Sequence, residues 1–288
     1  MIIFAADHGI ADQGVSIASS DVTAQMVSNF IDGGAAINCF CQVNNIDLYI
    51  VDAGIKKALD CASECFFVQR LGSGTADFSL HAAMSREQVQ QGFEFGRQIV
   101  TKLTQKGEHI LLLGEMGIAN TSSASALMCA LTHYQIEQCV GKGTGITEQQ
   151  YTHKLALIKK ALTRLTEDDD VTTILAQVGG FEIVQMVGAI LAAGQQQMPI
   201  MIDGFIVSIA ALAAYRLAPN ILGYFIFSHQ SDEQGHHLLL QEMSAEPLLS
   251  LGLRLGEGTG AALAWPLIQA AAYFYNNMAS FESAGVTV

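Results

Sequence analysis

The chain has 288 residues, of which 50% are hydrophobic and 14% are charged, and its formal net charge at pH 7 is −13. This composition excludes a disordered chain, which needs low hydrophobicity, and the length allows one large domain or two small ones with a substantial core. The acid excess argues against nucleic acid or an anionic membrane as a partner, because both are bound by basic patches.

The start of the chain and its cysteines indicate the compartment. No basic region precedes a long apolar segment at the N-terminus, so we expect no signal peptide. The longest apolar stretch, between Asp203 and Arg216, is too short to span a bilayer. The six cysteines form no C-x-x-C pair and match no zinc spacing. We therefore expect reduced thiols, no metal and a cytoplasmic protein.

Short apolar runs alternate with longer helical stretches along the chain. Five runs without polar alternation predict buried parallel strands, at residues 2–6, 48–51, 110–113, 200–202 and 224–227. Six stretches predict helices, at residues 22–40, 85–103, 120–132, 148–165, 181–193 and 261–278. This order predicts an α/β fold, with a Rossmann-like parallel sheet flanked by helices.

Polar residues follow the predicted strands. Asp7, Asp52, Glu115 and Asp203 each come directly after a strand or within two residues of its end. Because ligands bind outside the carboxyl ends of parallel strands, we expect these four acids to converge at one edge of the sheet. Each single acid is equally consistent with a helix cap or a strand end, so the prediction depends on their common placement.

Three glycine loops precede predicted helices, at residues 114–117, 141–145 and 256–260. Glycine lets backbone approach a ligand closely, and a helix N-terminus offers free N–H groups, so such loops can bind phosphate with few lysines. The sequence has neither a Walker motif nor a G-x-G-x-x-G after its first strand, which argues against a dinucleotide cofactor. Ordinary turn glycines remain the alternative for each loop.

Two glutamates in these loops are candidates for acid–base chemistry. Glu257 lies between two glycines in an apolar setting, where burial would raise the pKa of its carboxyl and let it accept a proton near neutral pH. Glu115 is placed similarly after a strand, and two such carboxyls could share the work. Solvated loop glutamates are the alternative.

Other chemistries have weaker support. Ser228 and His229 are adjacent, but no G-x-S-x-G elbow marks a serine hydrolase. The pair His236 and His237 is expected to be a solvated surface turn, because sequence neighbours rarely point at one metal. The acidic run at residues 167–170 is expected to be a solvated loop between helices.

Five segments resemble one family, the nicotinate-nucleotide:dimethylbenzimidazole phosphoribosyltransferases of cobalamin lower-ligand assembly. They read FAADHG at residues 4–9, GEMGIANT at 114–121, VGGFE at 178–182, IDGF at 202–205 and LRLGEGTGAA at 253–262. The second and last of these are highly specific, and similar motifs extend over nearly the whole chain. The resemblance implies transfer of the 5-phosphoribosyl group of nicotinate mononucleotide to 5,6-dimethylbenzimidazole, giving α-ribazole 5′-phosphate and nicotinate, with no cofactor and no metal.

The resemblance also implies roles for single residues. Glu257 stands at the position of the family's catalytic base and Glu115 at that of its second active-site glutamate, which would position the base or stabilise positive charge on the sugar. Asp203 is either a site residue or only structural. The residues that match phosphate and ribose contacts are Gly117, Gly141, Gly143, Ser231 and Lys154. The residues that match the pocket for the aromatic base are Gln25, Met26 and Leu255, and either Gln25 or Met26 faces the ring.

Family resemblance further implies a homodimer with two parts. We expect a catalytic α/β domain at residues 1–260 and, at residues 261–288, the C-terminal part of a small helical domain. Relatives carry an N-terminal helical segment with a K-P-x-G-S-L-G motif that is absent before residue 1, so we expect this small domain to be incomplete at its N-terminus. Two alternatives stay open: the same donor with another aromatic acceptor, and an inactive nucleotide-binding remnant.

Overall fold

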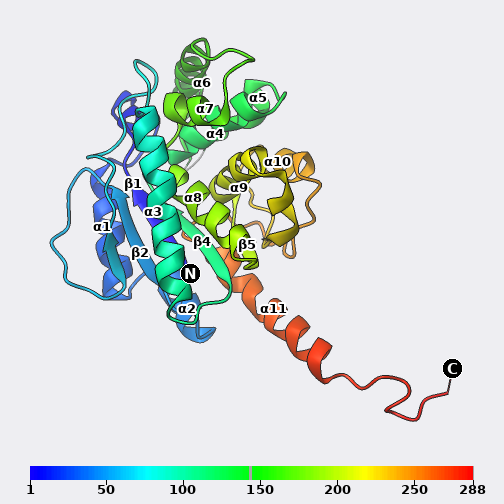
Figure 1. Cartoon of the computed structure of the whole chain (residues 1–288). Helices are drawn as coiled ribbons and strands as arrows, with labels where there is room; N and C mark the ends of the chain where they lie inside the picture. The colour runs from blue at the N-terminus through cyan, green and yellow to red at the C-terminus, as the bar shows by residue number, and fades with distance from the viewer. Residues whose placement is uncertain (143–144, 288) are drawn as a thin grey trace.

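A parallel β-sheet forms the centre of the molecule, seen in a computed structural model that describes residues 1–142 and 145–287 (Figure 1). Within these residues the sheet has six strands in the order β3-β2-β1-β4-β5-β6, and every neighbouring pair is parallel. The predicted α/β class with a parallel sheet is therefore confirmed. The strands are β1 Ile2–Ala6, β2 Tyr49–Gly54, β3 Phe66–Val68, β4 Leu111–Met116, β5 Ile200–Ile202 and β6 Phe225–Phe227.

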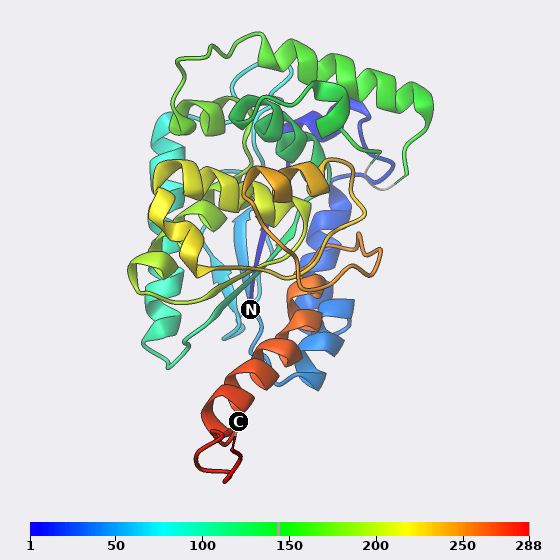
Figure 2. The ribbon, with the colours of Figure 1, turned by 90° about the vertical axis from the view of Figure 1, so that its right-hand side faces the viewer.

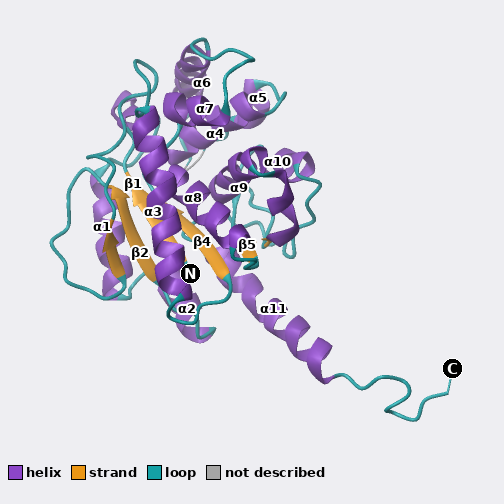
Figure 3. Cartoon of the chain, in the orientation of Figure 1, coloured by secondary structure: helices purple, strands orange, loops and turns teal. Residues whose placement is uncertain are grey.

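Side chains on the two faces of the sheet pack into two separate cores. In β1, Ile2, Phe4 and Ala6 contribute to one core, whereas Ile3 and Ala5 contribute to the other. This alternation follows from the two-residue period of a strand, and both faces are apolar because helices cover both. The result is a three-layer arrangement with helices on both faces of the sheet (Figure 3).

Thirteen helical segments surround the sheet in the described part of the chain. One face is covered by α3, α4, α8 and α9, and the other by α1, α2 and the start of α11. Their bounds are η1 Gly9–Gln13, α1 Asp21–Asp32, α2 Ala36–Val43, α3 Arg86–Thr104, α4 Asn120–Leu131, α5 Ile136–Cys139, α6 Glu148–Leu162, α7 Val171–Val178, α8 Phe181–Gln195, α9 Phe205–Leu217, η2 Pro219–Tyr224, α10 His236–Glu242 and α11 Thr259–Asn277.

Three of the sequence-based boundaries differ from the structure. The helix expected over residues 22–40 is two helices, because Gly33 ends α1 in the left-handed conformation, with φ of 81°. Residues 115–116, expected in a loop, continue β4, and the last helix begins at Thr259 instead of Ala261. The short edge strand β3 was not predicted, because only its first residue is buried.

The last helix, α11, leaves the body of the molecule (Figure 2). Its first turn is buried, with Ala261, Ala262 and Ala264 packed in the core beside α2. Toward its C-terminal end its aromatic side chains are exposed, including Tyr273 at 72% and Tyr275 at 83%. The expected domain boundary at residues 260/261 thus falls inside the buried first turn. None of the helices in the described residues is long and apolar enough to cross a membrane.

Candidate active site

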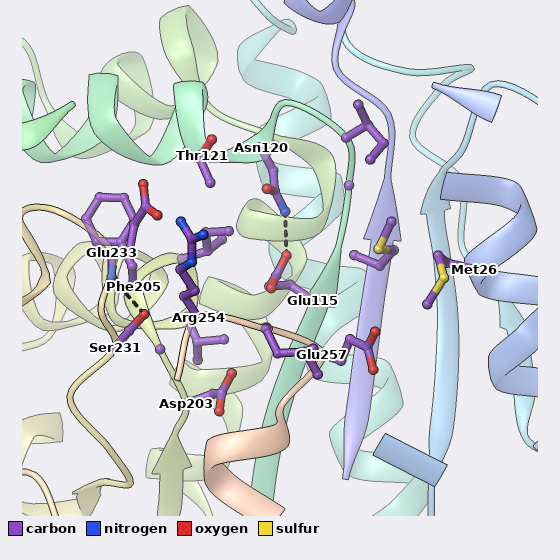
Figure 4. Close-up of a pocket in the computed structure, with 18 of the residues that line it drawn as sticks. Met26, Glu115, Asn120, Thr121, Asp203, Phe205, Ser231, Glu233, Arg254 and Glu257 are labelled. Atoms are coloured by element: carbon purple, nitrogen blue, oxygen red, sulfur yellow. Dashed lines mark hydrogen bonds between the residues drawn. The ribbon is translucent and has the colours of Figure 1, made fainter. Parts of the chain in front are cut away.

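A cavity of about 410 Å³ opens at the carboxyl ends of β4, β5 and β6. It lies beside the point where the strand order reverses between β1 and β4, which is where open α/β sheets bind ligands. The cavity is lined by residues from β4 and the start of α4, from the start of α9, from the segment after β6, from the loop before α11 and, on α1, by Met26 (Figure 4).

Glu115 is a buried carboxyl in the wall of this cavity. It is the fifth residue of β4, and its Oε2 accepts a hydrogen bond from the side-chain amide of Asn120 at the start of α4. Burial raises the pKa of Glu115 to about 8, and the nearby acids Asp203 and Glu182 act in the same direction. A pKa of about 8 favours the protonated, neutral form of Glu115 at neutral pH.

Glu257 is held by a loop that packs against β4. A Cβ on Gly114 would lie 2.5 Å from the carbonyl oxygen of Glu257, so only glycine at that strand position lets the loop come this close. The loop residues Gly256, Glu257 and Gly258 all have positive φ, of 80°, 63° and 84°. For a glutamate this conformation costs about 1–2 kcal/mol of conformational free energy. The neighbouring glycines have no Cβ and adopt it without this cost.

The carboxyl of Glu257 meets the N-terminus of a helix. Its Oε2 accepts a hydrogen bond from the Ile37 backbone N–H, 3.4 Å away, in the first turn of α2. Burial raises the pKa of Glu257, the Ile37 N–H opposes the rise, and the negative charge of Asp203 adds to it. In Figure 4 this carboxyl projects toward Met26, away from Asn120 and Thr121. The arrangement suits a carboxylate that accepts a proton near the apolar part of the cavity.

Asp203 links two structural elements at the cavity wall. It follows β5, and its Oδ1 accepts a hydrogen bond of 3.0 Å from the Ala261 backbone N–H at the start of α11. The same oxygen lies 3.5 Å from His229 Nε2. Asp203 therefore lines the cavity and also anchors the helix that follows the Glu257 loop.

The expected convergence of four acids is only half right. Glu115 and Asp203 line the cavity, but Asp7 and Asp52 do not. Asp52 accepts hydrogen bonds from the next backbone amides and pairs with Arg70 at 2.8 Å, and Asp7 accepts from the Lys56 N–H at 2.7 Å. Both acids hydrogen-bond backbone amides of the turns at the ends of β1 and β2, away from the cavity. This is a structural role at a strand end, which was the alternative stated for each single acid.

The residues expected near the phosphate lie in two layers. Gly117 and Ser231 line the cavity directly. Lys154 and Gly141 lie behind the wall: Lys154 is 1% exposed, and its Nζ donates to the carbonyl of Gly141 and to Thr121 Oγ1, both at 3.2 Å. Burial lowers the pKa of Lys154 to about 8. Gly143 lies outside the described residues.

Two of the three residues expected near the aromatic base line the cavity. Met26 is in the lining, whereas its neighbour Gln25 is exposed and is not, so Met26 is the one of this pair that faces the cavity. Leu255 lines the mouth, with its side chain 56% exposed.

Several lining residues were not predicted from the sequence, among them Asn120, Thr121, His229 and Arg254. All four lie inside or beside segments singled out above, and Asn120 and Thr121 are the first two residues of α4, which follows the glycine loop at residues 114–117. The expectation for His236 is wrong: it is fully buried behind the wall, while His237 is exposed.

The described residues contain no cluster of three or more His, Cys, Asp or Glu that could hold a metal.

Comparison with known proteins shows one consistent family. A family model described as a phosphoribosyltransferase matches residues 1–286. Similar curated proteins are named nicotinate-nucleotide–dimethylbenzimidazole phosphoribosyltransferase. One from Vibrio vulnificus strain CMCP6 is 55% identical over 100% of this chain and 84% of its own length. Another from Shewanella frigidimarina strain NCIMB 400 is 57% identical over 99% and 82%. A crystal structure of CobT from Thermus thermophilus aligns with a TM-score of 0.96 at 38% identity, over 99% of this chain and 85% of that one.

Proposed function

The chain belongs to this family of nicotinate-nucleotide–dimethylbenzimidazole phosphoribosyltransferases, and we propose that it catalyses the reaction named for its relatives. It transfers the 5-phosphoribosyl group of nicotinate mononucleotide to 5,6-dimethylbenzimidazole, with Glu257 as the general base. The observation that carries this assignment is the placement of Glu257 at the wall of a cavity that also contains Glu115 and Asp203.

The reaction needs a nucleophile, a leaving group and a base for the released proton. A ring nitrogen of the benzimidazole attacks the anomeric carbon with its lone pair, and the bond from that carbon to the nicotinate nitrogen breaks. The electrons of that bond neutralise the pyridinium, so nicotinate leaves without a metal or an acid. The second benzimidazole nitrogen then carries a proton in excess, which must go to a base. The carbon inverts from β to α, so the acceptor and the leaving group lie on opposite sides of the ribose.

Glu257 meets the requirement for a base. Burial raises its pKa above the ordinary glutamate range, which improves proton transfer near neutral pH, while the Ile37 N–H keeps the charged form accessible. The apolar side chain of Met26 is near this carboxyl in Figure 4. An aromatic acceptor fits there, because its ring needs apolar contacts and its N–H needs a carboxylate.

Glu115 is proposed to position the reactants through hydrogen bonds. The sequence left open whether it stabilises positive charge on the sugar or positions the base. With its pKa raised to about 8, it is mostly neutral before the reaction, so positioning is the role that its environment favours. The Asn120 side-chain amide and the Glu257 backbone N–H both hydrogen-bond the Glu115 carboxyl, which lines the cavity.

The phosphate and ribose are proposed to lie at the other end, beside Thr121, Ser231 and Arg254. Gly117 and the first residues of α4 bring backbone N–H groups to the wall, and a helix N-terminus favours an anion. Lys154 supports this wall from behind through Thr121. The acid-rich chain thus provides one lining cation, Arg254, among the described residues of the cavity.

The finer features expected from the sequence are also proposals. We propose that α11 belongs to a small helical domain and that two copies associate, which the exposed Tyr273, Phe274 and Tyr275 support because apolar surface of this size rarely stays uncovered. We also propose a cytoplasmic location, in keeping with six free cysteines.

The test is release of nicotinate from nicotinate mononucleotide, with and without 5,6-dimethylbenzimidazole. We expect release that depends on the acceptor, in equal amounts with α-ribazole 5′-phosphate. Adenine and a phenol serve as alternative acceptors, and faster transfer to one of them would replace the proposed acceptor. Absence of release with every acceptor, from folded protein, would overturn the assignment in favour of a nucleotide-binding remnant.

A further inference from the structure

A fully buried histidine, His236, lies directly behind the polar end of the cavity. It is the first residue of α10 and is 0% exposed. It does not line the cavity itself, but its ring packs edge-on against two residues that do, Phe205 and His229, with ring centroids 6.4 Å and 6.3 Å away. It therefore contacts the cavity wall from outside.

The hydrogen bonds of His236 fix which ring nitrogen carries the proton. The backbone N–H of Ser231 donates to Nδ1 at 2.8 Å, and because an amide N–H can only donate, Nδ1 must be unprotonated. The ring proton is therefore on Nε2, where it is donated to Ser208 Oγ at 3.0 Å. Burial lowers the pKa of His236 to about 3, so this neutral form persists across the physiological range.

The two partners of His236 belong to two different segments, each of which contributes residues to the cavity lining. Ser231 is in the segment that leads from β6 to α10, and Ser208 is in α9, whose first three residues line the cavity. Ser231 Oγ also accepts from the Glu233 N–H at 3.2 Å, which closes a tight turn at the same point. The imidazole therefore joins the Ser231 segment to the start of α9.

We propose that His236 is a positioning residue that fixes the Ser231 wall against α9, so that the ribosyl-phosphate half of the substrate meets a preformed surface. This inference rests on the proposed function, since it assumes that the Ser231 end receives the nucleotide. It predicts that damage to the imidazole weakens nucleotide binding and leaves the distant acceptor end unaffected.

Three substitutions separate this role from a purely structural one. In His236→Asn the side-chain oxygen can occupy the place of Nδ1 and still accept from Ser231. In His236→Gln the amide lies further out, toward Ser208, and leaves the Ser231 N–H without an acceptor. His236→Leu removes both bonds. The matched control is His237→Leu, the same change at the exposed neighbour.

The experiment measures nicotinate mononucleotide binding by calorimetry without acceptor, then KM for each substrate and kcat. We expect His236→Leu and His236→Gln to weaken nucleotide binding about tenfold, equivalent to about 1.4 kcal/mol. The acceptor KM and kcat should stay within about twofold. His236→Asn and His237→Leu should remain close to the unmodified protein.

Each outcome decides the matter. Equal nucleotide affinity in His236→Gln and His236→Asn would overturn the positioning role, as would equal losses for both substrates. Should His236→Leu not fold, the comparison of the Asn and Gln variants still decides. An unmodified protein that binds no nicotinate mononucleotide would instead refute the proposed function on which the inference rests.

Discussion

Replacing the proposed base by its amide, Glu257→Gln, is the most direct test of the mechanism. Glutamine has the same shape as a glutamate but cannot take up the acceptor's proton at neutral pH. Its amide oxygen can still accept from the Ile37 N–H, which lies 3.4 Å from the carboxyl in the native site. The backbone φ of 63° is equally strained for both residues, so the loop should keep its position.

The expected loss is in kcat. Removing a general base costs about 10²–10⁴-fold in rate, or about 2.7–5.5 kcal/mol of transition-state stabilisation. We expect a fall of at least about 100-fold in kcat for Glu257→Gln. The KM for nicotinate mononucleotide should change by less than about threefold, because that substrate is proposed to bind at the other end of the cavity.

The pH profile adds a second signature. Because burial raises the pKa of Glu257, activity of the native protein should rise with pH through a value above the ordinary 4.5, where the base loses its proton. This rise should vanish in the variant, whose residual rate has no carboxyl at residue 257 to titrate.

The assay follows acceptor-dependent release of nicotinate by the native protein, by Glu257→Gln and by Glu246→Gln. Glu246 is an exposed glutamate outside the cavity lining, so its substitution controls for the loss of one negative charge. Equal kcat for the native protein and Glu257→Gln would refute the assignment of the base. A loss confined to the nucleotide KM would show that Glu257 binds the donor instead.

Three further predictions concern buried polar groups. Glu115→Gln should gain stability relative to the native protein as pH rises from 5 to 8, by on the order of 2–4 kcal/mol. The reason is that a carboxyl with its pKa raised to about 8 stabilises the fold only while protonated; thermal unfolding at both pH values measures this, and a constant difference would contradict it. His8 Nε2 and Glu182 Oε1 form a fully buried pair 2.7 Å apart, so His8→Leu or Glu182→Leu alone should cost about 3–5 kcal/mol. The double variant should cost less than the two single costs combined in denaturant unfolding, and strict additivity would show that the pair is not coupled. Lys154→Met should weaken nicotinate mononucleotide binding about tenfold in calorimetry by freeing the Gly141 carbonyl and Thr121, and unchanged affinity would remove Lys154 from the site.

The sequence predicted the sheet well because its signal is local. Near-continuous apolar runs identify strands that are buried on both faces, and five of the six strands in the described residues follow that pattern. Strand β3 at residues 66–68 escaped because it is at the sheet edge and only partly buried. Helix α9 was not predicted either, since residues 205–214 are all buried and such a helix has no polar face to give a 3.6-residue period.

The site was less predictable because it depends on contacts between distant segments. Placement after a predicted strand is common to Asp7, Asp52, Glu115 and Asp203, but only the fold decides which of them face the cavity. Whether Gln25 or Met26 faces the cavity likewise depends on how α1 is rotated about its axis, which only the fold shows. His236 was expected at the surface, because nothing in the sequence indicates that it hydrogen-bonds Ser208 and Ser231. These two partners lie 28 and 5 residues away along the chain.

Four carboxyl groups line the cavity, those of Glu115, Asp203, Glu233 and Glu257, and the surroundings of Glu115, Asp203 and Glu257 differ in ways that help an acidic site to bind an anionic substrate. Glu115 is neutral below its raised pKa of about 8, so it adds little negative charge to the resting site. Asp203 accepts a hydrogen bond from the Ala261 N–H and lies beside His229, so its carboxyl is engaged at the start of α11. Of the three, Glu257 alone combines a raised pKa with a single, weak backbone hydrogen bond of 3.4 Å. Because the raised pKa of Glu115 favours its protonated form, Glu257 is the carboxyl proposed to take the acceptor's proton, and the cavity can separate this base at one end from a phosphate beside Arg254 at the other.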